Sequence, residues 1–348
     1  GRSGRSLRER ARMSERKKGM WRRAGDPKKG FTYVRADGKP LRSEAGLRRI
    51  RALAIPPAWT EVEIDPSPSA KIQASGFDAA GRKQYRYHAD FVARRSRRKF
   101  RKLLPFARAL PRLRERTNRH LARGDLGREQ VLATVVRLMC RAFFRVGSER
   151  YAVQNKTFGI ATLEKKHLEI EGNNLIFSYA GKRSIDQRRV VADTPLVEIV
   201  KELLELPGDR LFRYRLPGGE VRDVTATDVN EYIREILGER YTSKDIRTWG
   251  GTVRAATILA DLGPASNRRE AEKNLVLLCN LVSSELGNTP AICRSAYIHP
   301  AVMERYLAGE TIEKGMRKAP RLVEAESPVE FYPEEAALMR LLEEVEGD

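Results

Sequence analysis

The sequence predicts an α+β protein, in which a small antiparallel β-rich domain precedes a larger, mainly α-helical domain that contains a three-stranded β-hairpin sheet. Three observations predict this class. Residues 31–90 alternate short strand-like runs with turns rich in Gly, Asp and Pro. Beyond residue 126 most apolar residues follow the 3.6-residue period of buried helices. One stretch of that second part returns to strand-like runs and supplies the hairpins.

The first part of the chain divides into an arm and a domain. Residues 1–28 are rich in Arg, Lys, Gly and Ser without an apolar period, which is typical of a flexible basic arm. In 29–95 the predicted strands are FTYVR, WTEVEID, AKIQASGFD and KQYRYH, and Ser43 is the expected start of a helix. We therefore assign 29–95 to a β-rich N-terminal domain.

The second part begins after a densely basic, proline-punctuated junction at 96–125. GREQVLATVVRLMCRAFFRVG predicts a helix with one buried face, and HLEI, LIFSYA and QRRVVAD predict the hairpin sheet. Helix starts are expected at Thr194, at Thr227, at Ser243, near Asn267 and at Thr289. These elements make up a domain at 126–312, and residues 313–348 form an acidic C-terminal tail.

The charge balance indicates a polyanionic partner. Lys and Arg number 67 against 46 acidic residues, for a formal net charge of +21.

No apolar run approaches the roughly 20 residues that span a bilayer, and no secretory signal is seen. We expect a cytoplasmic, nucleoid-associated protein that does not bind membranes.

The chain has few features of cofactor sites. It contains three widely spaced cysteines, four scattered histidines and no G-x-x-x-x-G-K-[ST] loop. The sequence therefore predicts chemistry without a nucleotide and without an obligatory metal, with a divalent cation as a stimulant at most.

Tyr297, in NTPAICRSAYIHP, is the candidate nucleophile. A free phenol has a pKa near 10 and needs cationic neighbours to react with a phosphate. Arg145 and Arg247 can offer paired N–H donors to the non-bridging oxygens, Asn288 one more donor, and Lys182 a proton for the departing 5′ oxygen.

Each of these residues also has a structural interpretation when taken alone. Arg145, near the end of an apolar helix, is expected just before a C-cap at Gly147 and can serve the helix dipole. Arg247 is expected at the margin of a buried helix face, where its guanidinium would be held in place, although an ion-paired surface arginine beside a helix kink is at least as common. The pair Gly250–Gly251 costs its helix roughly 1 kcal/mol per glycine, which favours a close approach by another backbone.

The ordered motifs resemble the type IB DNA topoisomerases, in particular their poxviral and bacterial branch, from about residue 30 to about 310. FFRVGSERYAVQNKTFGIATLEKKHLEI resembles the segment with the first catalytic arginine, Arg145, and YAGKRSI the hairpin with the catalytic lysine, Lys182. KDIRTWGGT resembles the K-D-L-R-T pentad and implies Arg247, with Lys244 as an auxiliary proton donor. LGNTPAICRSAYIHP is similar to the stretch that ends in the nucleophile, Tyr297.

The resemblance also implies contacts with DNA. GRKQYRY is similar to a DNA-contacting strand of the family's N-terminal domain, in which Tyr85 and Tyr87 share one strand face. The contacts implied are Arg82, Gln84, Tyr85, Tyr87 and Tyr151. Asn288 is a departure, because many relatives have histidine there. Asparagine can still donate a hydrogen bond but cannot act as an acid.

For the whole protein the resemblance implies a monomer that closes as a C-shaped clamp around double-stranded DNA. Tyr297 would form a 3′-phosphotyrosyl link, and the cut strand would rotate before religation, which relaxes supercoils of either sign without ATP.

Two alternatives stay open at this point. A tyrosine site-specific recombinase uses a similar residue set, although its N-terminal domain is usually helical. A non-catalytic basic DNA-binding protein would explain the charge alone, and its affinity for DNA would fall with salt in the same way.

Overall fold

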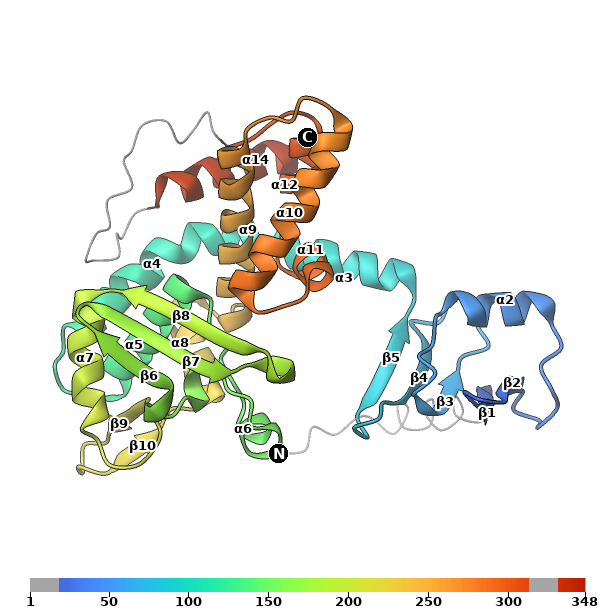
Figure 1. Ribbon diagram of the computed structural model, residues 1–348, viewed down its shortest axis with the longest axis horizontal. Helices are drawn as coiled ribbons and strands as arrows, with labels where there is room; N and C mark the ends of the chain where they lie inside the picture. Colours follow the sequence, from blue (N-terminus) through green and yellow to red (C-terminus); the bar gives the residue numbers. More distant parts are fainter. Residues whose placement is uncertain (1–18, 313–330, 348) are drawn as a thin grey trace. The chain divides into compact units, whose positions relative to one another are not determined.

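The computed structural model describes residues 19–312 and 331–347 and divides into two compact units, 1–98 and 99–348 (Figure 1). The first unit holds an antiparallel sheet and the second is mainly helical, which confirms the α+β class. Helix α3 (Ala89–Arg101) contains the boundary between the units. The predicted clamp stays a prediction, as do the predicted domain boundaries.

The first unit contains a five-stranded sheet of order β2-β1-β3-β4-β5, helix α2 (Glu44–Ala52) and most of α3. Ser43 caps that helix as predicted, and its side chain accepts a hydrogen bond from the Gly46 N–H. The small core comprises Leu41, Ile50, Val62, Ile64 and Ala74. The strands are β1 (Trp21–Asp26), β2 (Gly30–Val34), β3 (Thr60–Ile64), β4 (Ile72–Phe77) and β5 (Lys83–Tyr87).

Strand β1 lies inside the segment 1–28 that the sequence assigns to an arm. WRRAGD has no apolar alternation, so no local signal marks it as a strand. It is held by tertiary contacts instead: β1 pairs with β2 and β3, and the Trp21 ring packs on the small core. Residues 1–18 of the predicted arm lie outside the described residues.

The second unit is built around one large apolar core that includes buried faces of α4, α5, α8 and α9. Most of its predicted helix starts agree with the observed ones within one residue. The helices are α4 (Leu103–Leu121), α5 (Arg128–Ala142), α6 (Glu149–Asn155), α7 (Thr194–Leu204), α8 (Ala226–Leu237), α9 (Ser243–Leu262), α10 (Arg268–Leu286), α11 (Pro290–Ala296), α12 (Pro300–Leu307) and α14 (Pro333–Gly347), with the 3₁₀ turns η1 (Ile160–Thr162), η2 (Lys165–His167) and η3 (Lys182–Ser184).

The three predicted hairpin strands form one antiparallel sheet of order β6-β7-β8. They are β6 (Leu168–Glu171), β7 (Asn174–Ala180) and β8 (Asp186–Ala192), and η3 forms the turn between β7 and β8. Helices α5 and α7 pack against this sheet. A second, two-stranded sheet pairs β9 (Arg213–Arg215) with β10 (Val221–Asp223). Within the described residues, no helix is long and apolar enough to cross a membrane.

Much of the predicted basic junction is a core helix, α4. Its apolar side chains Leu103, Phe106, Leu110 and Leu113 are buried. Pro105 lies in the first turn of α4, where backbone N–H groups have no partner within the helix, so the missing N–H costs nothing. Pro111 lies inside the same helix. Many arginines stand between these apolar positions, so the composition of the segment does not show its helical period.

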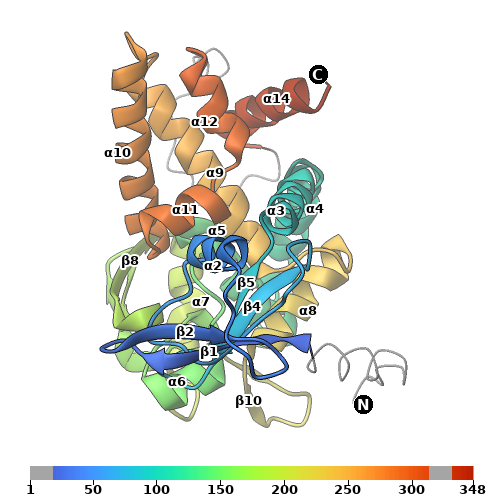
Figure 2. The ribbon, with the colours of Figure 1, turned by 90° about the vertical axis from the view of Figure 1, so that its right-hand side faces the viewer.

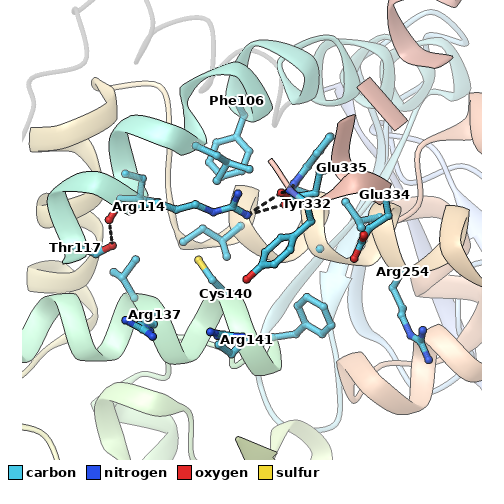
Figure 3. A pocket seen from close by; sticks show the side chains of 18 of the residues that line it. Phe106, Arg114, Thr117, Arg137, Cys140, Arg141, Arg254, Tyr332, Glu334 and Glu335 are labelled. Atoms are coloured by element: carbon cyan, nitrogen blue, oxygen red, sulfur yellow. Dashed lines mark hydrogen bonds and ion pairs between the residues drawn. The ribbon is translucent and has the colours of Figure 1, made fainter. Parts of the chain in front are cut away.

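Helix α14, in the acidic C-terminal segment, packs on α4 and α9 (Figures 1 and 2). Its Glu335 is buried, and the carboxylate accepts hydrogen bonds from Arg114 Nη2 at 2.8 and 2.9 Å and from Trp249 Nε1 at 3.0 Å. These groups line a cavity of about 290 Å³ with Cys140 in its wall (Figure 3). The remainder of the predicted tail, 313–330, lies outside the described residues.

Candidate active site

Arg247 is the most deeply buried of the predicted site residues, and only 3% of its surface is exposed to solvent. It lies in the first turns of α9, whose start is fixed by a capping box between Thr242 and Asp245. Its Nη2 donates to the Leu286 carbonyl at 2.9 Å, and its Nη1 donates to the Phe143 carbonyl. The guanidinium is therefore held in place as expected, because it binds the terminal carbonyls of two other helices. The expected position at the margin of the helix face is wrong, because Arg247 is buried.

Arg145 follows α5 rather than ending it. The C-cap of α5 is Phe143, which has a left-handed conformation (φ 54°), so the predicted cap at Gly147 is wrong. Arg145 Nη2 donates to the Gly287 carbonyl and to Asn288 Oδ1, both at 2.5 Å. The end of α10 thus brings Arg145, Arg247 and Asn288 together.

Gly287 is the residue that turns the chain at this point. It has φ +62°, and a Cβ there would lie 2.2 Å from Gln187 Oε1 of strand β8. A side chain would therefore combine the roughly 1–2 kcal/mol cost of the left-handed region with a clash. Glycine lets the carbonyl of 287 and the amide of Asn288 both reach Arg145.

Gly287→Ala is expected to lower both stability and the rate of DNA cleavage, because the shifted turn misplaces Asn288 and Arg145. The free energy of unfolding should fall by about 1–3 kcal/mol, measured by denaturant unfolding. Gly309→Ala is the matched control, since Gly309 also has a positive φ (+86°) but no atom within 4 Å of the added Cβ. Equal cleavage defects in the two variants would contradict a special role for the 287 turn.

Tyr297 stands at the C-cap of the short helix α11, directly beside α9. Its carbonyl accepts a hydrogen bond from Thr252 Oγ1 at 3.1 Å. A Cβ on Gly251 would lie 3.0 Å from that same carbonyl, and one on Gly250 would lie 2.1 Å from the Phe143 ring. The close approach predicted from the glycine pair is confirmed, and it places the tyrosine next to Arg247.

The Tyr297 ring lies close to two cationic groups. The Arg247 guanidinium carbon is 5.3 Å from the ring centroid, and Lys99 Nζ is 5.6 Å from it. Burial lowers the pKa of Arg247 to about 10, opposed by the attraction of the Tyr297 oxygen and reinforced by the charge of Arg145. Burial also lowers the pKa of Arg145. Arg247 nevertheless keeps its proton at neutral pH, so the site presents positive charge next to a phenol.

Several buried N–H donors at this site lack a well-formed hydrogen bond. Among the described residues, these donors are Arg247 Nε, Asn288 Nδ2 and Arg189 Nε. The groups that interact with these three side chains are the weak acceptors Tyr297, Cys293 and Tyr179. Buried unpaired donors are uncommon and costly in folded proteins. Their grouping indicates a place for an external anion with several acceptor oxygens, such as a phosphodiester.

Arg189 is a site residue that the sequence predictions missed. It lies on β8, its Nη2 donates to Gln187 Oε1 at 2.6 Å, and its Nη1 donates to the Glu285 carbonyl. Its charge also acts on the pKa values of Arg145 and Arg247. The strand period could have found it, because Arg189 shares a face with the buried residues Gln187 and Val191.

The two predicted lysines are placed differently from the arginines. Lys182 lies in η3 at the exposed hairpin tip, and within the described chain its side chain makes no hydrogen bond or ion pair. Lys244 is exposed in the first turn of α9. The structure therefore brings Tyr297, both arginines and Asn288 together, and leaves Lys182 in solvent.

The predicted DNA-contact residues of the first unit lie on β5, except Arg82, which directly precedes it. Tyr85 and Tyr87 share a face, with ring centroids 5.9 Å apart, and Tyr85 is 41% exposed. Arg82 Nε and Gln84 Nε2 both donate to Asp78 Oδ2 at 2.9 Å. Because side chains alternate along a strand, Gln84 belongs to the opposite face of β5 from the two tyrosines. In the second unit, Tyr151 is 46% exposed on α6.

Comparisons with known proteins agree with these motifs. Residues 88–324 match the family described as eukaryotic DNA topoisomerase I, catalytic core, and residues 30–78 match bacterial DNA topoisomerase IB, N-terminal domain. The chain is 31% identical over 283 residues to the DNA topoisomerase 1B of Acanthamoeba polyphaga mimivirus, a match that covers 79% of this chain and 84% of the relative.

More distant relatives come from poxviruses. The chain is 25% identical over 230 residues to the DNA topoisomerase 1B of vaccinia virus (strain Copenhagen) and 24% identical over 230 residues to the DNA topoisomerase I of monkeypox virus. Each match covers 66% of this chain and 70% of the relative. The chain therefore belongs to the type IB DNA topoisomerases, in their poxvirus-like and bacterial branch.

Proposed function

We propose that this protein relaxes positive and negative supercoils in double-stranded DNA by cutting and resealing one strand through Tyr297. The Tyr297 oxygen attacks a backbone phosphorus, a 3′-phosphotyrosyl bond forms, and the bond from phosphorus to the 5′ oxygen breaks. The phenol loses its proton and the leaving 5′ oxygen gains one. The observation that carries this proposal is the group of buried N–H donors without well-formed hydrogen bonds around Arg247 and Asn288, beside the phenol.

Arg145 and Arg247 would contact the non-bridging oxygens as charge gathers there in the transition state. Their guanidinium groups are already fixed by carbonyl acceptors, so little reorganisation is needed when the phosphate arrives. Asn288 would contribute its Nδ2, because its Oδ1 is engaged by Arg145. It would stabilise charge and would transfer no proton.

Proton donation to the 5′ oxygen falls to the lysines. Lys182 is the main candidate and Lys244 the auxiliary one, since an ammonium can give up a proton whereas an arginine retains it. Lys182 projects from a hairpin tip, where a bound DNA backbone would supply the acceptor that the described residues do not. DNA binding would therefore complete the site.

The energetics require no ATP, and the arginines and lysines would supply the positive charge that an obligatory metal could otherwise provide. The ester bond is exchanged for another ester, so the 5′ hydroxyl can attack the phosphotyrosyl bond and reseal the strand. We propose that one molecule encloses the duplex between its two units, with Tyr85, Tyr87 and Tyr151 on the DNA. Such a protein would act in the nucleoid.

The test is relaxation of a negatively and a positively supercoiled plasmid by dilute protein in EDTA, without ATP. Full relaxation of both substrates is expected, read as topoisomer ladders on agarose gels. An unchanged linking number with intact DNA binding would reject the proposal and favour the recombinase or the non-catalytic DNA-binding protein. Denaturant-trapped protein–DNA adducts would separate those two, because the recombinase forms them at its own sites.

A further inference from the structure

Lys99, in the last turn of α3, is a buried lysine that no sequence motif singled out. Its Nζ is buried and makes no hydrogen bond to any described residue. The Nζ lies 4.4 Å from the Phe100 ring centroid and 5.6 Å from that of Tyr297. A buried amine without a hydrogen-bond acceptor destabilises the folded protein. The position of this amine beside the predicted nucleophile therefore needs a functional explanation.

The groups that face Lys99 leave it without a counter-charge. Lys244 and Asp245 come from α9, Lys102 from the residue before α4, and His299 from the cap of α12. Asp245 is the acid among them, and it already binds Lys102 Nζ at 2.6 Å and caps α9. His299 supplies no counter-charge, because an imidazole is either neutral or cationic; its Nδ1 accepts from the Ala301 N–H.

These surroundings lower the pKa of Lys99, so its side chain loses a proton more readily than an ordinary lysine does. Burial lowers the pKa of Lys99 to about 7, Lys244 and Lys102 lower it as well, and Asp245 opposes them. Burial, with a smaller effect of Lys99, lowers the pKa of His299 to about 4. Near neutral pH, therefore, roughly half of the molecules would hold Lys99 as a neutral amine.

We propose that Lys99 binds a DNA backbone phosphate next to the one that Tyr297 attacks, and that it takes up a proton from solvent when DNA binds. The argument rests on the proposed function, since it assumes a DNA strand at Tyr297. A phosphate oxygen would give the buried Nζ the acceptor it lacks and would restore its ammonium form. No covalent bond changes in this step, and the proton remains on Nζ while the DNA is bound.

The proposal predicts a pH-dependent affinity with a defined sign. Free Lys99 is mostly protonated below pH 7, so binding there needs no proton. Above pH 7 each binding event takes up one proton at Lys99, and the affinity should fall by up to tenfold per pH unit from this group. Lys99→Arg keeps its charge throughout and should lose this component of the slope. Lys99→Met should lose it too, and should bind more weakly at pH 6.5.

The measurement is the anisotropy of a fluorescent duplex titrated with the full chain carrying Tyr297→Phe, between pH 6.5 and 9 at fixed salt. The same background with Lys99→Arg, Lys99→Met or Lys201→Arg supplies the comparison, since Lys201 is an exposed lysine that pairs with Glu198. The Lys201 variant should keep the parent's slope. At pH 6.5, Lys99→Met should also reduce the slope of log affinity against log salt by about one unit.

A stability measurement separates this role from a structural one. The pKa of Lys99 in the folded protein lies below its ordinary 10.5, so the destabilisation is fully present below pH 7 and is relieved as pH rises toward 10.5. Lys99→Met should therefore raise the thermal unfolding temperature at pH 6.5 while weakening DNA binding. A lysine that serves the fold would give the opposite change in unfolding temperature.

The outcomes distinguish this proposal from the proposed function. If Lys99→Met binds DNA with the parent's affinity and pH slope, the phosphate contact is rejected, even when the wild-type protein relaxes plasmids. If the slope depends on Lys99 but the wild-type protein forms no covalent adduct, the phosphate contact stands and the strand-cutting function fails. A lower unfolding temperature for Lys99→Met, with an unchanged slope, would assign Lys99 to the fold.

Discussion

Tyr297→Phe is expected to abolish DNA cleavage and plasmid relaxation while leaving the affinity for duplex DNA almost unchanged. The substitution removes the attacking oxygen but keeps the ring, which still packs beside Arg247 and Lys99. The Thr252 hydrogen bond to the carbonyl of 297 is also kept, because it involves backbone. Cleavage is measured as the fraction of end-labelled DNA that denaturant traps on the protein.

Tyr306→Phe is the control for loss of a tyrosine hydroxyl from the same unit. The Tyr306 hydroxyl donates to the Gly263 carbonyl at 2.9 Å and accepts from Asn274 Nδ2 at 2.7 Å. Its loss should lower the free energy of unfolding by about 1–3 kcal/mol and leave cleavage intact. Trapped adduct in the Tyr297→Phe protein would show that another residue is the nucleophile.

Arg247→Ala has the second largest expected effect, a decrease in the cleavage rate of about 10³-fold or more. The variant loses a fixed pair of donors to the phosphate and leaves the carbonyls of Phe143 and Leu286 without their donor. The free energy of unfolding should therefore also fall, by about 1–3 kcal/mol. Single-turnover cleavage of a labelled duplex at saturating protein isolates the chemical step from any change in binding.

Two comparisons make that result specific. Arg254→Ala alters an arginine two turns along the same helix, which pairs with Glu285 at 2.7 Å, and it should cleave at nearly the parent's rate. Arg247→Lys keeps a cation but loses the planar fork, so its rate should lie between those of the parent and the alanine variant. A cleavage rate for Arg247→Ala within about tenfold of the parent's would remove Arg247 from the proposed mechanism.

Local signals explain which parts of the fold could be predicted. Helix starts are predictable where a capping residue or an N-terminal proline stands, as at Ser43 and Thr289, because caps act within one turn. The hairpin strands are predictable because turn residues separate short apolar runs. Strand β1 depends on pairing with β2 and β3, and the apolar face of helix α4 is interrupted by arginines. The composition of these two segments therefore predicts neither element.

Some residues of the candidate active site can be predicted from the sequence, and others cannot. Tyr297 and Arg247 lie in motifs whose order is visible in the chain, and the glycine pair at 250–251 pointed to the close approach that the structure contains. Arg189 and Lys99 have no such motif. Their importance depends on burial and on missing partners, which appear only when β8, α3 and α11 are assembled.

The most direct test of the central claim is to identify the residue that becomes bonded to DNA. Wild-type protein is incubated with a duplex that spans a cleavage site, denatured, digested with trypsin and nuclease, and analysed by mass spectrometry. We predict a single peptide carrying a nucleotide through its 3′ phosphate on Tyr297, with a free 5′ hydroxyl on the other DNA fragment. Attachment at a different residue, or through a 5′ phosphate, would contradict the account.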